Sequence, residues 1–475
     1  MMSGWQSCGR TPMCERFTWD RTVSLGIITM QPQAHVERLV NLLDPTANIL
    51  LNMDFEEATR RVGSGDPEQV RQIDGQFALV NKQGKIVRMA RSIGRPMRFF
   101  LAKQAAGPVL VVAERIDEIH AYLKQHGMDD QFHPSYTRMV PAHYLSELSL
   151  LGCPDPSPVQ RRYLQSHRDR LPANVDEIGK AYIGALAHEI DQFLNTIADD
   201  QPLGVMFSGG IDSGTVLLAT YQVLLNRGQS PARLKAFTLT VDGNQRDLAQ
   251  AREFLQALDL EFLLEAVEVD SSAVDYKAAI RVIEDYKPLD VQAAAMGQAL
   301  LSAIRSRYPE WRYVVDGDGA NENLRDYPIE ENAELTIRSV LSNPFFYHEG
   351  WGVDKVKHSL TYSGGQSRGH VRTYAPAKQL GFVGFSPFAT ANVIEVAEGI
   401  PFVELTDWDE QRLYDLKGQI CQRGIELLTG LSMPLYPKLR FQRGAVSEDA
   451  FSQLFPESAA VYRRTFAEQY EGRKT

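Results

Sequence analysis

The fold is decided by the stretch "VMFSGGIDSGTVL", Val205–Leu217. It ends an apolar run, "LGVMF", that has the length of a buried strand, and it opens a segment with helical spacing, "DSGTVLLATYQVLLNR". The glycines therefore lie at a strand-to-helix turn. Because backbone N–H groups and the positive end of the helix dipole meet there, the turn forms an anion site, and Gly209 and Gly210 let a ligand approach the backbone closely.

Three polar side chains accompany these glycines. Ser208 and Ser213 can donate hydroxyl hydrogen bonds to an anion. Asp212 is unfavourable beside a phosphate unless a cation lies between the two. A tight turn in which Asp212 caps the helix explains the same pattern, so the motif alone leaves both interpretations open.

The chain around this turn alternates between strand-like and helix-like segments. Strands are expected at "LGVMF", "LKAFTLTV", "EFLLEAVEV" and "RYVVDGDG", and helices at 175–197, 212–227, 247–258 and 291–308. Such alternation predicts a parallel sheet with helices on its faces. In sheets of this kind ligands bind at the carboxyl ends of the strands.

A second glycine-bearing turn follows a strand at "VVDGDGANENLRDY", Val314–Tyr327. It gathers three acidic residues, Asp316, Asp318 and Glu322, at the same expected edge of the sheet. Acidic side chains near a phosphate loop are explained if Mg²⁺ lies between them and a polyphosphate. A solvated acidic turn is the alternative.

Length and composition limit the class of protein. A chain of 475 residues exceeds one ordinary core, so two or three domains are expected, and 44% hydrophobic with 23% charged residues describes a globular protein. The net charge of −10 makes nucleic acid an unlikely partner. No apolar run has membrane-spanning length and no secretory signal is evident, so neither a membrane nor secretion is expected. Four cysteines without metal-type spacing favour a reducing cytoplasm.

The N-terminal part has a different pattern. The segments "GQFALVNKQGKIVRMAR" and "GPVLVVAE" predict short strands joined by turns, hence a region rich in antiparallel sheet. A stretch rich in proline and charge follows, which suggests a junction. We therefore expect an N-terminal domain over 14–150, a linker over 151–174 and a second domain over 175–475.

With these motifs in place, the chain resembles the N-type ATP pyrophosphatases, and within them asparagine synthetase and the β-lactam and carbapenam synthetases. The resemblance rests on landmarks that follow the family's order: "SGGIDS", the strand "AFTLTV", "DGDGANEN" where the family has an SGEGSDE-like loop, and "KLRFQRG", Lys438–Gly444. It covers roughly residues 73–444. It implies an α/β plus α+β protein: a parallel-sheet synthetase domain like the adenine nucleotide alpha hydrolases, preceded by a degenerate Ntn-hydrolase-like, glutaminase-like domain.

The resemblance implies an ATP-dependent ligase that adenylates a carboxylate, releases pyrophosphate, and lets an amine of the same molecule or ammonia displace AMP. ATP and Mg²⁺ are the implied cofactors, and a homodimer is one oligomeric state it leaves open. The residues implied in nucleotide binding are Met206, Ser208, Gly209, Gly210, Asp212, Ser213, Leu239, Asp316 and Gly317.

Metal and catalytic roles are implied in the same way. Asp212 and Asn321 are the implied metal ligands, although the family has aspartate at the second position and an amide lacks its charge. Asp318 lies where the family has the group that serves or orients the general base, and Glu349 is its candidate partner. Lys438 is the candidate cation for the phosphates, against the alternative of a solvated surface lysine.

Glutamine use is not expected. A glutaminase needs an N-terminal cysteine nucleophile, and this chain starts with Met1, Met2 and Ser3. Cys14 follows a methionine, but Glu15 stands where glycine is expected, and the glutamine-holding segments are absent.

Two other functions remain open at this stage. A tRNA-modifying enzyme with the same loop is disfavoured by the acidic balance and by the lack of a CxxC sulfur site. A non-catalytic relative that only binds nucleotide is kept open by Asn321.

Overall fold

The computed structural model describes residues 38–104, 107–149, 158–326, 329, 336–343, 368–436 and 441–471. All of them lie in one compact unit, which runs from Ala34 to Thr475. Within these residues, no helix is both long and apolar enough to cross a membrane.

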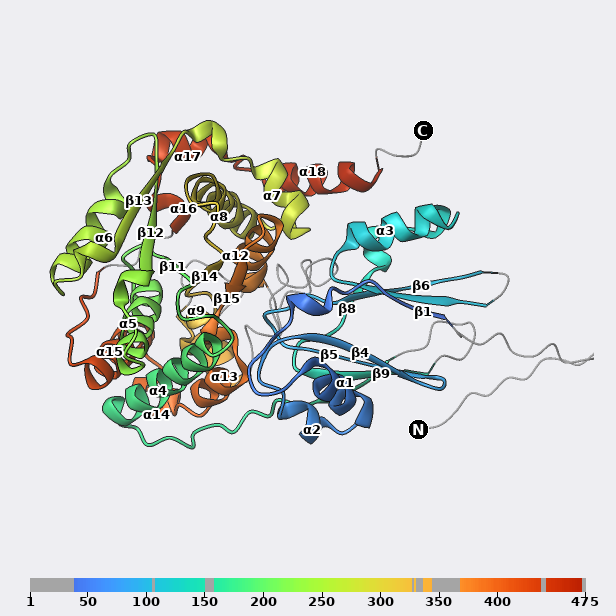
Figure 1. The fold of residues 1–475 in the computed structure, drawn as a ribbon, viewed down its shortest axis with the longest axis horizontal. Helices are drawn as coiled ribbons and strands as arrows, with labels where there is room; N and C mark the ends of the chain where they lie inside the picture. The colour runs from blue at the N-terminus through green and yellow to red at the C-terminus, as the bar shows by residue number, and fades with distance from the viewer. Residues whose placement is uncertain are drawn as a thin grey trace, which may run out of the picture. The chain divides into compact units, whose positions relative to one another are not determined.

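The C-terminal region is built on a five-stranded sheet with the order β13-β12-β11-β14-β15, in which every neighbouring pair is parallel. The strands are β11 (Leu203–Met206), β12 (Leu234–Val241), β13 (Leu264–Val269), β14 (Tyr313–Val315) and β15 (Val383–Phe385). The predicted parallel sheet is thereby confirmed. The chain leaves β11 towards β12 on one side and returns to β14 on the other, so the strand order reverses at β11 (Figure 1). A parallel sheet binds ligands at such a switch point.

Helices connect these strands and cover both faces of the sheet (Figure 1). They are α4 (Val175–Leu194), α5 (Ile211–Asn226), α6 (Arg246–Gln256), α7 (Tyr276–Ile283), α8 (Pro288–Arg307), α9 (Ala320–Leu324), α10 (Ile337–Ser342), α12 (Arg368–Gln379), α13 (Ala391–Glu398), α14 (Phe402–Thr406), α15 (Glu410–Thr429), α16 (Phe441–Gly444), α17 (Glu448–Leu454) and α18 (Ala459–Glu471).

Because successive side chains of a strand point to opposite faces of the sheet, the strands contribute to two hydrophobic cores. Leu203, Val205 and Ala236 pack with α4, α5 and α15 on one face. Phe237 and Leu239 pack with α7 and α8 on the other. Residues of opposite parity in β12 thus face opposite layers, as the pleat requires.

The N-terminal region contains two four-stranded sheets, β1-β7-β6-β8 and β10-β9-β5-β4, and a short pair of β2 with β3. The strands are β1 (Arg38–Asn41), β2 (Ile49–Leu50), β3 (Gly75–Gln76), β4 (Ala78–Gln83), β5 (Ile86–Arg91), β6 (Arg98–Ala102), β7 (Val109–Ala113), β8 (Arg138–Met139), β9 (Tyr144–Ser149) and β10 (Val159–Arg162). All pairs except β1 with β7 are antiparallel, which confirms the predicted sheet type.

The two sheets pack face to face through apolar side chains such as Met89, Phe99 and Val112. Their outer faces carry α1 (Phe55–Ser64) and α2 (Pro67–Arg71) on one side and α3 (Ile116–Gln125) on the other (Figure 1). Short 3-10 turns complete the chain at Pro45–Ala47, Asp129–Gln131, Pro134–Tyr136, Pro231–Arg233, Glu261–Leu263, Ser271–Ala273 and Pro387–Ala389.

The range expected to be a linker, 151–174, is partly strand. β10 pairs with β9 in antiparallel register, Val159 opposite Glu147, and so extends an N-terminal sheet. Polar side chains on this edge strand hid it from the sequence pattern, because only one of its four residues is apolar. Residues 151–157 lie outside the described part of the chain.

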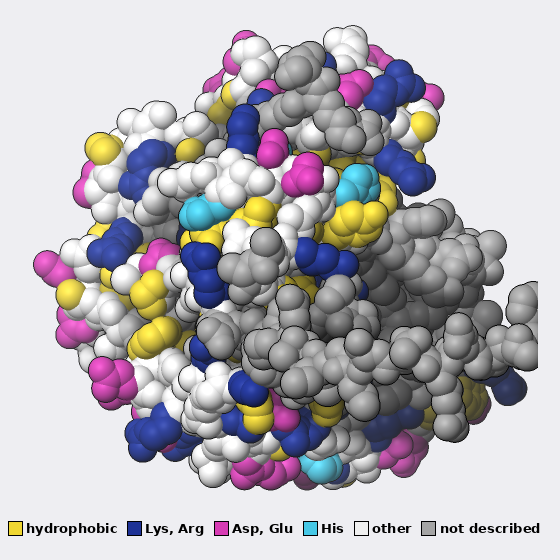
Figure 2. All heavy atoms as spheres, turned by 90° about the vertical axis from the view of Figure 1, so that its right-hand side faces the viewer, with side chains coloured by type: hydrophobic (Ala, Val, Ile, Leu, Met, Phe, Trp, Pro, Cys, Tyr) yellow, Lys and Arg dark blue, Asp and Glu magenta, His cyan; other side chains and the backbone are white. Residues whose placement is uncertain are grey.

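Charges of both signs are interspersed on the surface. On the face in Figure 2, Lys and Arg side chains alternate with Asp and Glu across the described atoms.

Candidate functional site

The first loop of the site leaves the carboxyl end of β11. Phe207 N donates to Phe237 O at 2.9 Å, and the chain then turns through Ser208–Gly210 into α5. Gly209 has φ +72°, and a Cβ there would lie 2.9 Å from the backbone nitrogen of Ala251 on α6. Glycine is therefore required for both the turn and the close approach.

The N-terminus of α5 is open to an anion. Its N-cap is Gly210 and no side chain caps it, whereas Asn174 caps α4 and Asp409 caps α15. The alternative in which Asp212 caps this helix is thus wrong. Ser213 Oγ lies 3.2 Å from Ser208 N and 3.3 Å from Ser208 Oγ, so both hydroxyls border the same turn.

The second loop leaves β14, the neighbour of β11, and touches the first. A Cβ on Gly317 would lie 3.0 Å from Asp212 C and from Ser213 N. The absence of a side chain at this position lets the acidic loop pack directly on the start of α5. The two loops singled out in the sequence therefore form one surface.

Two carboxylates of the second loop have different surroundings. Asp316 is buried and accepts from Ser386 Oγ at 2.8 and 3.0 Å and from Asp318 N at 2.9 Å. Burial, with the charge of Asp318, raises the pKa of Asp316 well above its usual range. Asp316 thus links the second loop to the end of β15.

Asp318 faces α12. It accepts from Thr373 Oγ1 at 2.7 Å, and the guanidinium of Arg372 lies 3.7 Å away. Burial raises the pKa of Asp318 to about 6, while Arg372 and Thr373 oppose the rise. A carboxylate with this pKa is ionised at neutral pH and can accept a proton, which suits a general base.

The structure adds a residue that the sequence reasoning missed, Lys417 on α15. Its side chain is 3% exposed, and its Nζ lies 2.6 Å from Asp212 Oδ1, 2.5 Å from Asn321 Oδ1 and 3.0 Å from Asp326 Oδ2. Burial alone would lower the pKa of Lys417, but the charges of Asp212 and Asp326 outweigh it and raise the pKa. The signal in the sequence was its place on the apolar side of the helix, with Leu413, Leu416, Ile420 and Cys421.

The expected metal ligands do not fit a metal ion in this arrangement. Asp212 and Asn321 are brought together, but both turn an oxygen to the same ammonium. Among the described residues, no cluster of three or more His, Cys, Asp or Glu could hold a metal ion.

The side of the site towards β12 is formed by strand backbone. β12 extends past β11, whose pairing ends at Met206 with Phe237. Phe237 O and Val241 N both bond on this side, to Phe207 N and Ala445 O. Alternate residues of a strand direct their backbone groups to the same side. The backbone groups of Leu239 therefore point to this side as well, between the bonds made by Phe237 and Val241. Gly297 of α8 lies close by, with its Cβ position 3.8 Å from Met206 Cε.

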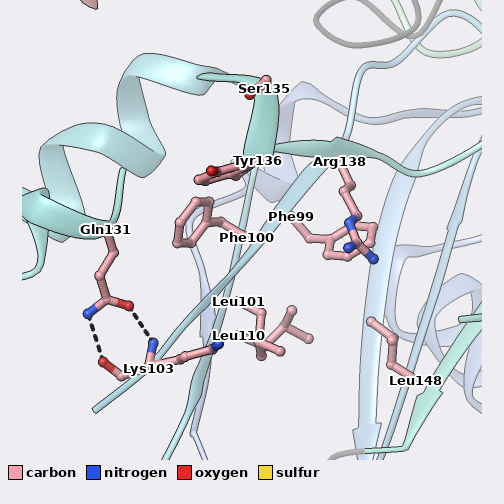
Figure 3. Close-up of a pocket in the computed structure, with 10 residues that line it drawn as sticks. All are labelled: Phe99, Phe100, Leu101, Lys103, Leu110, Gln131, Ser135, Tyr136, Arg138 and Leu148. Atoms are coloured by element: carbon pink, nitrogen blue, oxygen red, sulfur yellow. Dashed lines mark hydrogen bonds between the residues drawn. The ribbon is translucent and has the colours of Figure 1, made fainter. Parts of the chain in front are cut away.

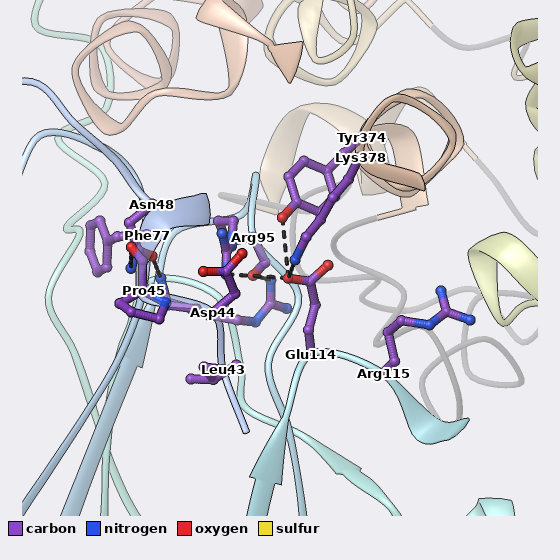
Figure 4. Close-up of polar contacts among 12 residues, drawn as sticks. Leu43, Asp44, Pro45, Asn48, Phe77, Arg95, Glu114, Arg115, Tyr374 and Lys378 are labelled. Atoms are coloured by element: carbon purple, nitrogen blue, oxygen red, sulfur yellow. Dashed lines mark hydrogen bonds and ion pairs between the residues drawn. The ribbon is translucent and has the colours of Figure 1, made fainter. Parts of the chain in front are cut away.

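The N-terminal region contacts the site through α12. Lys378 Nζ donates to Glu114 Oε2 at 2.7 Å and Tyr374 Oη donates to the same oxygen at 3.2 Å (Figure 4). Arg95, fully buried, pairs with Glu114 at 3.2 Å. The helix α12, whose Thr373 donates to Asp318, is thereby bound to the end of β7.

Two expected catalytic residues, Lys438 and Glu349, lie outside the described residues. The helix that follows Lys438 is described: Gly444 lies against the carboxylate of Asp247, where a Cβ would overlap it. Burial raises the pKa of Asp247 to about 7. This places α16 beside α6 at the edge of the site.

A cavity of about 440 Å³ lies elsewhere, in the N-terminal sheets (Figure 3). Its wall includes Phe99, Tyr136 and Arg138, and Gln131 closes one end by exchanging two hydrogen bonds of 2.8 Å with the backbone of Lys103. None of the residues expected in the site lines it.

The family model described as asparagine synthase matches residues 191–378. Over this segment the chain is similar to the asparagine synthase family. The family comprises ATP-using, amide-forming ligases, and the asparagine synthase segment includes both loops and α12 up to Lys378.

Curated proteins and solved structures offer little further similarity. No curated protein matches the sequence. Among solved structures, the NMN synthetase from Francisella tularensis is 17% identical, over 32% of this chain and 59% of that chain, with a TM-score of 0.22. The chain thus spans less than two thirds of that protein.

Proposed function

We propose that this protein is an ATP-dependent ligase that joins a carboxylate to an amine and forms AMP and pyrophosphate. The observation that carries the proposal is the pair of glycine-bearing loops, in contact at the carboxyl ends of adjacent parallel strands, beside a helix N-terminus without a side-chain cap. The asparagine synthase match includes both loops.

In the proposed complex, the polyphosphate of ATP lies over Ser208–Ser213 and its adenine lies against Met206 and the backbone of Leu239. The acid substrate's carboxylate oxygen attacks the α-phosphorus, and the bond from that phosphorus to the bridging oxygen breaks to release pyrophosphate. The amine then attacks the acyl carbon, and AMP leaves. Asp318 accepts the amine proton, with Thr373 holding the carboxylate in place.

The remaining roles come from the resemblance. Lys438 stabilises charge on the phosphates as pyrophosphate departs, and Glu349 assists Asp318. Gly317 and Asp316 shape the loop that receives the adenylate. Magnesium would enter as the ion that ATP itself binds, and we derive no step through a metal held by the protein.

The N-terminal region, in this proposal, is a degenerate glutaminase-like domain, and glutamine is not the nitrogen source. Adding glutamine should release no glutamate. Glutamate release that disappears in Cys14→Ser would contradict this.

The test is ATP–pyrophosphate exchange across a panel of amino diacids. Exchange should appear with some acids and fall at least a hundredfold in Asp212→Ala, because the substitution removes the contact between Asp212 and Lys417 through which the two loops are joined. Asp191→Ala is the matched control, because Asp191 also pairs with a cation, Arg227 at 2.7 Å, on a remote surface. Nucleotide binding without exchange under any acid would favour a non-catalytic relative, and exchange that requires RNA would favour a tRNA-modifying enzyme.

A further inference from the structure

Lys417 connects the two loops of the site. Asp212 belongs to the first turn of α5, whereas Asn321 lies within the short helix α9 that follows β14 and Asp326 lies just after that helix. All three turn a side-chain oxygen to within 3.0 Å of the same nitrogen atom. The ammonium therefore occupies the point where the phosphate loop and the acidic loop converge.

The ammonium occupies the place where a cation shared by Asp212 and Asn321 is expected. Magnesium binds oxygen ligands at about 2.0–2.1 Å. Lys417 Nζ lies 2.6 and 2.5 Å from the two oxygens, so both oxygens already have a cation as their neighbour.

The ammonium has no donor left for a phosphate. A lysine carries three N–H bonds, and three acceptors surround this one. Its direct effect is on the loops: it offsets the charge of Asp212, which otherwise would repel a polyphosphate at the helix N-terminus.

The helix that carries Lys417 is held rigidly. Gly424 of α15 crosses Gly179 of α4, where a Cβ on Gly179 would lie 2.8 Å from Gly424 N. Gly418, next to Lys417, leaves room for Leu435, whose Cδ1 would lie 3.2 Å from a Cβ there. The ammonium is thus presented from a backbone that cannot shift easily.

We propose that Lys417 is a positioning residue that takes the place of a metal ion between Asp212 and Asn321. The inference rests on the proposed function in one respect, that a phosphate is the ligand of the first loop. The protein's own cation, and not an ion bound by this pair, then keeps the two loops together and keeps Asp212 compatible with an anion.

The test uses Mn²⁺ alone on the nucleotide-free full chain, with the free ion followed by electron paramagnetic resonance. Asp212→Asn should leave the titration of the wild type unchanged. Lys417→Ala removes the ammonium and leaves three oxygens facing one another, so it should bind Mn²⁺ at least tenfold more tightly than the wild type. Adding Asp212→Asn to Lys417→Ala should remove the new site.

Lys378→Ala is the matched control, because Lys378 pairs with the buried Glu114 away from the loops, and it should bind Mn²⁺ as the wild type does. If Lys417→Ala is unfolded without metal, Mn²⁺ should raise its folded fraction, measured by circular dichroism, since an ion that binds only the folded state stabilises that state. If no such rise occurs, the inference is decided by comparing the Mn²⁺ titration of the wild type with that of Asp212→Asn.

The inference is overturned if the wild type binds Mn²⁺ and Asp212→Asn does not. It is also overturned if Lys417→Ala folds but binds Mn²⁺ no more tightly than the wild type. No readout here requires catalysis. Failure is therefore distinguishable from a lack of ATP–pyrophosphate exchange.

Discussion

The N-terminal sheets and the C-terminal sheet each bury positive charge, and they direct it to different partners. Arg91 in the N-terminal region is fully buried and donates to backbone carbonyls, those of Val140 at 2.5 Å and Arg95 at 3.1 Å. Burial lowers the pKa of Arg91 to about 9. Lys417 in the C-terminal region instead contacts side chains of two loops.

The difference separates two uses of a buried cation. Backbone carbonyls belong to the fold, so a cation that binds them fixes the course of the chain. Side-chain oxygens at the ends of parallel strands face the ligand, so a cation that binds them sets the charge of a site. Loss of the first kind should lower stability, and loss of the second kind should alter binding and rate.

Lys438→Met should have the largest effect on rate and tests a third use, a cation that faces the substrate. In the proposed mechanism Lys438 contacts the phosphates as charge develops on the departing pyrophosphate, so turnover should fall about a hundredfold, or about 3 kcal/mol, while ATP affinity changes only a few-fold. Single-turnover kinetics and nucleotide titration measure the two. Unchanged turnover would remove Lys438 from the mechanism.

Arg91→Met should act on stability alone. The substitution leaves the carbonyls of Val140 and Arg95 without this donor, at a cost of about 2 kcal/mol in the free energy of unfolding. Urea denaturation measures that cost. The rate of ATP–pyrophosphate exchange per folded molecule should match that of the wild type. A tenfold slower rate in fully folded protein would contradict the distinction between the two uses of a buried cation.

Gly317→Ala should sharpen the comparison at the contact between the loops. The added Cβ would press on the backbone of Asp212 and Ser213, so we expect exchange to slow about tenfold, or about 1.4 kcal/mol. Gly184→Ala is the control: it is an exposed helical glycine with no neighbour near its Cβ position. It should gain about 0.5–1 kcal/mol of stability and keep its rate. Equal rates in both variants would contradict the role of the contact.

The pH profile of Asp318 should give the smallest effect at neutral pH. A base with a pKa of about 6 loses activity below that pH, so the rate should rise through pH 6 and then level off. Asp318→Asn should abolish this limb. The folded chain holds the Asp318 proton more tightly than the unfolded chain, so ionisation between the ordinary value of 3.8 and 6 lowers stability. The variant should therefore be at least as stable as the wild type at pH 8, and a clear loss would contradict the raised pKa.

The sequence predicts much of the sheet and both loops, because strand length, helical spacing and glycine positions are local signals. It does not reveal β10, whose exposed edge carries polar side chains. Nor does it reveal Lys417, since a lysine within "LYDLKGQI" matches an ordinary amphipathic helix until its neighbours in space are known. Burial of a charge depends on partners distant in the chain, and composition cannot identify them.

The origin of Lys417 has a consequence for biosynthesis. The asparagine synthase match ends at residue 378, but the ammonium between the loops comes from α15, 96 residues beyond Asn321. During translation both loops leave the ribosome before their cation exists. The nascent chain therefore passes through an interval in which Asp212 and Asp326 lack this partner, and the loops can reach their final contact only after α15 has been made and has packed against α4.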